Sequence, residues 1–177
     1  MTLDGPSPAE GWGEPRSRTV TWWDPQITAR GMRDLGGVQF LQAMMEGRLP
    51  PPPINRLLRM TAVSVEEGTV EFRCLPDESA YNPIGLVHGG LVCTLLDSVV
   101  GCAVHTTLPA GMGYTSLEIK VSYLRPVRHG AGELTATGRI AKAGRRVAFA
   151  DAEVRDQHGR LTATASGTCL VFPLGEE

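Results

Sequence analysis

The sequence lacks three features that would place it in a specialised class of protein. No apolar run approaches the roughly 18 residues of a membrane-spanning helix, and the N-terminus has no apolar stretch typical of a signal peptide. Neither sign of charge dominates, because 17 Lys and Arg residues stand against 19 Asp and Glu residues, for a net charge of -2. This balance argues against a nucleic-acid partner. We therefore expect a soluble, cytoplasmic protein with no membrane partner.

Cysteine is sparse and scattered. The four cysteines never form a Cys-x-x-Cys pair, and each has mainly apolar neighbours: Cys74, Cys93, Cys102 and Cys169. A zinc site needs clustered ligands, and the four histidines are not spaced to complete one. A disulfide framework is expected in short secreted chains, which this sequence does not resemble. We expect buried, unpaired thiols and no metal site.

Length and turn content predict a single α+β domain with an N-terminal addition. The 177 residues slightly exceed a typical domain of roughly 150, and 21 glycines and 13 prolines favour many turns over a helical bundle. Residues 1–20 are polar and rich in Gly and Pro, which predicts a flexible tail. We expect residues 21–56 to form an extension and residues 57–173 to form the main domain.

The extension contains one helical pattern and one proline run. Apolar residues between Gly36 and Gly47 recur at near-helical spacing, and Gly47 suits a C-cap. The four prolines at 50–53 cannot continue a helix and predict a stiff, extended connector. We expect Trp22 and Trp23 to dock on the body of the domain.

In the main domain the apolar period changes to two. Residues 61–65 and 69–74 flank Glu66-Glu67-Gly68, which predicts a hairpin. Residues 117–123 alternate between apolar and polar side chains, as a half-buried strand does. Three more strands are expected, at 132–142, 145–156 and 160–172. Short strands joined by hairpins predict a mostly antiparallel sheet.

One segment breaks this pattern. Residues 89–106 are apolar on nearly every side, and their length suits a buried helix of about five turns lying against the sheet. Asp97 is the only ionisable residue between His88 and His105. It either pairs with a basic residue or reaches the surface, or it is a carboxylate tuned as a base or nucleophile. The spacing alone does not favour one of these interpretations over the other.

The helix is preceded by Asn82-Pro-Ile-Gly-Leu-Val-His88-Gly89-Gly90. Two glycines at a helix start either make a tight turn or let a substrate approach N–H groups that act as an oxyanion hole. Gly89 and Asp97 lie ~12 Å apart along one helix, too far to act on one carbonyl. If both are catalytic, Gly89 of one subunit faces Asp97 of another, and the enzyme is an obligate dimer.

The sequence around these residues resembles a known protein family. The motif at 82–90 with Asp97, followed by Tyr-Thr-Ser-Leu-Glu-Ile-Lys-Val-Ser-Tyr-Leu-Arg-Pro at 114–126, resembles the hotdog-fold acyl-CoA thioesterases of the PaaI-like (phenylacetate-pathway) group. The resemblance covers roughly residues 57–172. It implies a curved antiparallel sheet around a long central helix, with active sites between the protomers of a homodimer, and often a tetramer of two dimers. The implied reaction is hydrolysis of an acyl-CoA to a free acid and CoA, without metal or cofactor.

The resemblance also implies roles by position. Asp97 would be the catalytic carboxylate, as a general base or as a nucleophile, and Gly89 would supply the oxyanion N–H. Asn82 would orient the attacking water. Ser116 would place a hydroxyl near that water, with Thr115 as the alternative because the preceding loop varies in length.

Substrate contacts are assigned less specifically. His88 and Gly90 belong to the same motif, and we expect His88 mainly to fix the loop by hydrogen bonding. Among the cations that could meet the CoA phosphates, we select Arg125 and Arg145. Three apolar residues of the extension line either the acyl pocket or the core, and the core is favoured: Phe40, Met44 and Met45.

Three rival functions remain. A hotdog hydratase or dehydratase would also use a histidine and a carboxylate, but typically in another motif context than His-Gly-Gly. In a non-catalytic acyl-CoA-binding module, one or more of the catalytic residues should be missing, whereas all four candidate catalytic residues are present. A purely structural dimer does not explain why the apolar helix contains the ionisable residue Asp97. Thioester hydrolysis is the favoured interpretation.

Overall fold

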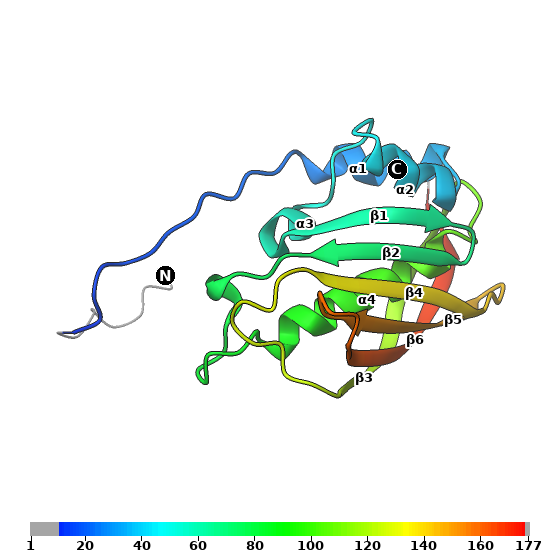
Figure 1. The fold of residues 1–177 in the computed structure, drawn as a ribbon. Helices are drawn as coiled ribbons and strands as arrows, with labels where there is room; N and C mark the ends of the chain where they lie inside the picture. The colour runs from blue at the N-terminus through cyan, green and yellow to red at the C-terminus, as the bar shows by residue number, and fades with distance from the viewer. Residues whose placement is uncertain (1–10, 176–177) are drawn as a thin grey trace.

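Residues 11–175 are described by a computed structural model, as one six-stranded antiparallel sheet with a long helix across it (Figure 1). The strands are β1 Met60–Glu66, β2 Thr69–Cys74, β3 Met112–Tyr123, β4 Leu134–Lys142, β5 Val147–Arg155 and β6 Leu161–Pro173. Their order in the sheet is β1-β2-β4-β5-β6-β3, and every neighbouring pair is antiparallel. The predicted hairpin, the later strands and the α+β class are confirmed.

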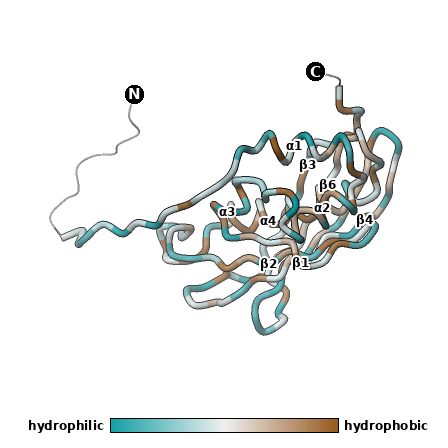
Figure 2. Tube along the Cα trace, turned by 90° about the horizontal axis from the view of Figure 1, so that it is seen from above, coloured by the Kyte–Doolittle hydropathy of each residue, from teal (hydrophilic) through white to brown (hydrophobic). Residues whose placement is uncertain are grey.

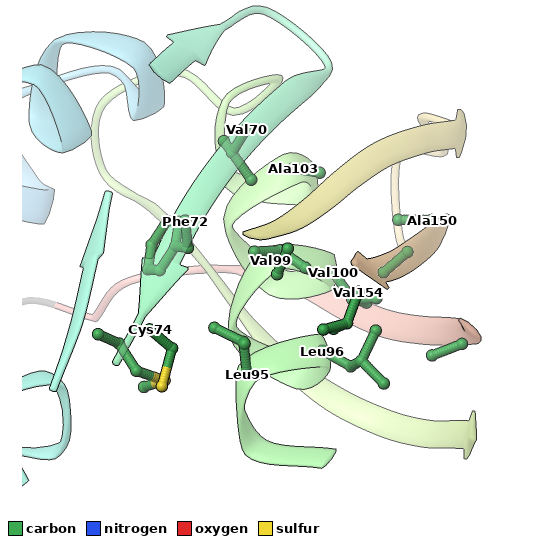
Figure 3. Close-up of a cluster of buried hydrophobic side chains, with 14 of the residues drawn as sticks. Val70, Phe72, Cys74, Leu95, Leu96, Val99, Val100, Ala103, Ala150 and Val154 are labelled. Carbon is green, nitrogen blue, oxygen red and sulfur yellow. The ribbon is translucent and has the colours of Figure 1, made fainter. Parts of the chain in front are cut away.

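The central helix α4, Gly89–His105, packs against this sheet. Figure 3 shows Leu95, Leu96 and Val99 on the buried face of α4. They point toward side chains of the sheet, among them Phe72 of β2 and Val154 of β5. Two glycines of the sheet allow the close approach. A Cβ at Gly138 of β4 would lie 2.1 Å from the carbonyl oxygen of Val99, and one at Gly167 of β6 would lie 2.6 Å from Val100 Cγ1.

The helix is not buried on every side, and the prediction was wrong on this point. One stripe is only half-buried in the single chain: Cys93, Thr94, Asp97, Ser98 and Cys102. Residues at this spacing share one helix face. A helix that is apolar overall but carries an Asp, a Ser and a Thr on one face leaves that face at the surface of the chain.

Strand β3 forms one edge of the sheet next to this stripe. The predicted half-buried alternation is only partly present, because Leu117 and Tyr123 are 58% and 55% exposed while Ile119 and Val121 are half-buried. An edge strand has a partner on one side only, and its outer backbone groups remain available for pairing.

Three shorter helices precede the sheet: α1 Pro25–Asp34, α2 Gly37–Met45 and α3 Pro53–Leu58. The helix predicted between Gly36 and Gly47 is α2, and Gly47 lies just beyond its end with a φ of 74°. Helix α1 was not predicted. The extended connector ends earlier than expected because Pro53 begins α3, and proline is accommodated at the first position of a helix since no N–H is needed there.

Helix α2 belongs to the same core as the sheet. A Cβ at Gly37 would lie 1.7 Å from the carbonyl oxygen of His105, so α2 meets the end of α4 through bare backbone. Phe40 is buried in the core and Met44 packs against it, which supports the core interpretation for both, whereas Met45 is exposed.

The segment before α1 has neither helix nor strand in its described part, residues 11–24, and runs past α3 (Figure 2). Trp22 and Trp23 do not enter the core. They are 58% and 50% exposed, and Trp23 meets the body through Arg56, whose guanidinium carbon lies 5.7 Å from the ring centroid. The predicted tail falls partly on residues 1–10, which lie outside the described residues.

One buried titratable group lies where α2 meets α4. The His105 side chain is 2% exposed, and its ring centroid lies 5.0 Å from that of Phe40 and 5.5 Å from that of Tyr114. Burial lowers the pKa of His105 from 6.5 to about 4. Between these values the unfolded chain binds a proton that the folded chain does not, so stability falls as the pH falls through this window.

We expect the free energy of unfolding to fall by about 2 kcal/mol more between pH 7 and pH 5 in the wild type than in His105→Phe. Phenylalanine keeps an aromatic ring between Phe40 and Tyr114 but does not titrate. Carboxylates titrate in both proteins and cancel in the difference. Urea unfolding at the two pH values measures the effect, and equal pH dependence in both proteins would contradict the assignment to His105.

Candidate active site

The start of α4 is shaped by His88, which caps the helix. Its Nδ1 accepts a hydrogen bond from the N–H of Gly90 at 2.8 Å, and its carbonyl oxygen accepts one from the N–H of Leu91 at 3.0 Å. The neutral imidazole therefore carries its proton on Nε2. The N–H of Gly89 donates to no atom of residues 11–175. One backbone donor at the positive end of the helix thus remains available to bind negative charge.

Asn82 builds the loop that leads into this helix start. Its Oδ1 accepts hydrogen bonds from the N–H groups of Ile84 at 3.2 Å and Leu86 at 3.0 Å, and its own N–H donates to the Leu86 carbonyl at 2.8 Å. The side-chain oxygen is therefore occupied by the turn. The Nδ2 amide group has no partner within the described part of the chain and is the end that can meet a water molecule.

Tyr123 is a residue of this site that the sequence interpretation missed. Its hydroxyl donates a hydrogen bond to the Gly89 carbonyl at 2.9 Å. A Cβ at Gly89 would lie 3.2 Å from Tyr123 Cζ, so the ring also covers the glycine. Burial, followed by the nearby Cys93 thiol, raises the pKa of Tyr123. The available signal was its place at the end of the alternating strand, directly before Leu-Arg-Pro.

The middle of α4 carries Asp97, whose Oδ1 accepts a hydrogen bond from Ser116 Oγ at 2.8 Å. Ser116, and not the alternative Thr115, therefore meets the carboxylate. The register of β3 against β6 shifts between Ser116 and Glu118, and such a bulge redirects a side chain. Asp97 itself is half-buried, not fully buried as the apolar helix suggested.

The groups behind the carboxylate stay uncharged at neutral pH. Burial raises the pKa of Cys102 to about 12 and the pKa of Tyr114 well above 10, and it also raises the pKa of Cys169. The negative charge of Asp97 raises all three pKa values further. The carboxylate of Asp97 therefore has neutral side chains, and not charged ones, behind it.

The cysteines are unpaired, as predicted, but only two are fully buried. Cys74 and Cys169 lie in the core, whereas Cys93 and Cys102 lie on the half-buried stripe of α4. Burial raises the pKa of Cys74 to about 11. Among residues 11–175, no group of three or more His, Cys, Asp or Glu side chains could hold a metal ion. No helix in that range is long and apolar enough to cross a membrane.

One chain does not bring all the candidate residues together. Gly89 and Asp97 are eight positions apart on α4, which corresponds to ~12 Å along the axis. Arg125 lies near Gly89 in a cleft of about 290 Å³ and donates from Nη1 to the Leu161 carbonyl at 2.6 Å. Arg145 lies in the turn between β4 and β5. The strand registers put that turn at the opposite end of the sheet from Arg125.

This chain is similar to known proteins over most of its length. Residues 84–163 match the model of the thioesterase superfamily. Mouse acyl-coenzyme A thioesterase 13 is 30% identical over 132 residues, which cover 73% of this chain and 93% of the relative.

Two solved structures are also similar to this chain. A phenylacetic acid degradation-related thioesterase from Ralstonia eutropha is 32% identical, with a TM-score of 0.68 over 73% of this chain and 98% of that chain. A Streptococcus mutans protein bound to acetyl CoA is 28% identical, with a TM-score of 0.59 over 64% of this chain and 89% of that chain. The chain therefore belongs to the thioesterase superfamily, as a hotdog-fold thioesterase of the acyl-CoA and phenylacetate-related group.

Proposed function

We propose that this protein is a cytoplasmic acyl-CoA thioesterase that hydrolyses an acyl-CoA to a free acid and CoA. The observation that carries the proposal is the pairing of Asp97 with Ser116 on the half-buried stripe of a helix whose first N–H is free. Thioester hydrolysis needs a base or nucleophile and a donor for the developing oxyanion. The acetyl CoA and CoA held by two structural neighbours support CoA as the carrier.

The proposed active unit is a homodimer. Because one α4 cannot present Gly89 and Asp97 to the same carbonyl, Gly89 of one protomer would face Asp97 of its partner, giving two equivalent sites. Two features of the single chain support this arrangement: the half-buried stripe of α4 and the open edge of β3 beside it. Pairing two β3 edges would extend the sheet across the dimer. Two such dimers would form the tetramer that the family resemblance implies.

In the proposed reaction the thioester oxygen accepts a hydrogen bond from the Gly89 N–H as the carbonyl carbon becomes tetrahedral. Asp97 either takes a proton from the attacking water or attacks the carbonyl itself to give a mixed anhydride that water then cleaves. Ser116 holds the carboxylate, and the Asn82 amide orients the water. The C–S bond breaks, the CoA thiolate leaves and takes up a proton, and the acid is released.

Cations for the CoA phosphates would come from Arg125 and Arg145. Because the two residues lie at opposite ends of the sheet in one chain, a single phosphate group would meet both only across protomers. His88 and Gly90 would act on the substrate by holding the Gly89 peptide in place, since they bond to each other on either side of it.

A mixed dimer tests this proposal directly. The Asp97→Asn variant and the Gly89→Pro variant are co-expressed with different tags, and the heterodimer is isolated by tandem affinity purification. The Gly89→Pro variant lacks the N–H at position 89. Release of CoA is followed with a thiol reagent over short, medium, long and aryl acyl-CoAs. Each homodimer should be nearly inactive, whereas the heterodimer retains one intact site of two and about half the wild-type rate.

Other outcomes contradict specific parts of the proposal. An inactive heterodimer with an active wild type would mean that Gly89 and Asp97 act within one chain, whereas an active homodimer of either variant would mean that the substituted residue has no role. A wild-type dimer that binds acyl-CoAs without releasing CoA would favour the non-catalytic binding module.

A further inference from the structure

A cleft of about 670 Å³ lies between the segment before α1 and the start of α4. The segment contributes Arg18 and Val20, and helix α3 contributes Leu57 and Leu58. The remaining walls come from the loop before α4 and from its first turns: Ser79, Ala80, Tyr81, His88, Gly90, Leu91 and Thr94. His88 and Gly90 flank Gly89 in the sequence, so the cleft reaches the start of α4, whereas Gly89 itself lines the other cleft, of about 290 Å³. A volume of this size suits a small organic ligand.

The segment is attached to the body at several points although it has no helix or strand. Arg18 Nη2 donates to the Leu57 carbonyl at 2.5 Å, and its Nη1 lies 3.6 Å from Asp77 Oδ2. Arg16 forms an ion pair with Glu78. We call residues 16–23 the strap. These contacts hold the strap across α3, so Val20 forms a wall of the cleft in the folded chain.

Four of the five polar side chains of the cleft already have partners in the protein, and the fifth, His88, is bonded through Nδ1 while its Nε2–H has no partner among residues 11–175. Arg18 is held as described, and Ser79 Oγ donates to Asp77 Oδ1 at 2.5 Å. Tyr81 Oη bonds to His129 Nδ1 at 3.1 Å, and Thr94 Oγ1 donates to the Gly90 carbonyl at 2.9 Å. A hydrogen-bonding ligand therefore gains little here.

Several apolar groups of the cleft, by contrast, are partly exposed, whereas Leu91 is buried. Leu57 is 47% exposed, and Val20 and Leu58 are half-buried. Burying such surface under a hydrocarbon chain is favourable because it removes apolar area from water. The cleft thus offers apolar contact at one end and the helix start at the other. The strap and α3 both lie outside residues 84–163, the part that matches the family model.

We propose that the strap builds the acyl-binding cleft and that Val20, which lines it together with Leu57 and Leu58, sets the length of acyl chain that the enzyme accepts. This inference rests on the proposed function, because the thioester must lie at Gly89 for its acyl chain to enter the cleft. Val20 is a specificity-determining residue in this arrangement and takes no part in the chemical step.

In the test, a larger side chain is introduced at a strap residue so that it occupies part of the cleft. Val20→Trp is compared with Thr19→Trp, in which the neighbouring, exposed strap residue that does not line the cleft carries the same indole. We expect kcat/KM for octanoyl-CoA, relative to acetyl-CoA, to fall at least about tenfold in Val20→Trp and to stay near the wild-type ratio in Thr19→Trp. Leu57→Trp, at another residue that lines the cleft, should act like Val20→Trp.

Binding is measured separately from turnover. In an Asp97→Asn background, the Kd ratio of free CoA to octanoyl-CoA reports the contribution of the acyl chain. Val20→Trp should reduce this ratio about tenfold, and Thr19→Trp should not. If the wild type hydrolyses no acyl-CoA but the binding ratio falls as expected, the proposed function fails and the cleft assignment stands. If folded Val20→Trp and Leu57→Trp keep both ratios while the wild type hydrolyses acyl-CoAs, the cleft assignment is overturned.

Discussion

Replacing Asp97 by asparagine should reduce kcat for acyl-CoA hydrolysis at least about 100-fold, a loss of about 3 kcal/mol of transition-state stabilisation. Asparagine keeps the size of the side chain and an oxygen that accepts the Ser116 hydroxyl, so the 2.8 Å contact can persist. What is lost is the negative charge that takes a proton or attacks the carbonyl. The rate of CoA release at saturating substrate measures the effect.

Ser98→Ala is the matched control for this variant. Ser98 lies on the same half-buried stripe of α4, one position further on, and its hydroxyl donates to the Thr94 carbonyl at 2.8 Å within the helix. Its removal should leave kcat close to the wild-type value, since Ser98 takes no part in the proposed chemistry. Undiminished hydrolysis in folded Asp97→Asn would exclude this carboxylate as the catalyst.

The second large effect is expected at Gly89, where proline removes the N–H without moving the helix start. Proline suits this position because it is the first of the helix, and because the preceding His88 has φ −61° and ψ 134°, the extended conformation preferred before proline. Loss of one oxyanion donor typically costs about 10²- to 10³-fold in kcat. We expect a loss in that range for Gly89→Pro.

Gly89→Ala separates the N–H from the effects of added bulk. Its Cβ also meets Tyr123 Cζ at 3.2 Å, so a slight displacement of the ring is common to both variants, but alanine keeps the N–H. The alanine variant should therefore retain most of the activity that the proline variant loses, at a similar melting temperature. Equal activities of the two variants would show that the Gly89 N–H does not hold the oxyanion.

The parts of the fold that were predictable are those set by local periodicity. The alternation in residues 117–123 and the apolar run after Gly89 identified β3 and α4, because strand and helix periods differ clearly. Helix α1 was missed since its ten residues include only a few apolar positions. Pro53 was assigned to the connector because a proline run indicates extended chain, although its last member can begin a helix.

The candidate site was predictable where a motif places residues on one element, and not where two elements meet. Gly89 and Asp97 follow from positions along α4. The contact of Tyr123 with the Gly89 carbonyl, and the choice of Ser116 over Thr115, depend on how β3 lies beside α4 and on its bulge. The exposure of Asp97 depends on which face of α4 the sheet leaves open. Neither arrangement has a local pattern in the sequence.

The strand order has a consequence for synthesis of the chain. Strand β3 precedes β4, β5 and β6 along the chain, yet it pairs only with β6, from Met112 opposite Pro173 to Tyr123 opposite Ala163. During translation, β3 has no partner within the chain until the last strand has left the ribosome, and α4 lacks part of its cover until the same moment. Closure of the sheet is thus a late, long-range event, and a nascent chain that stalls before β6 presents both an apolar helix and an open strand edge to other chains and to chaperones.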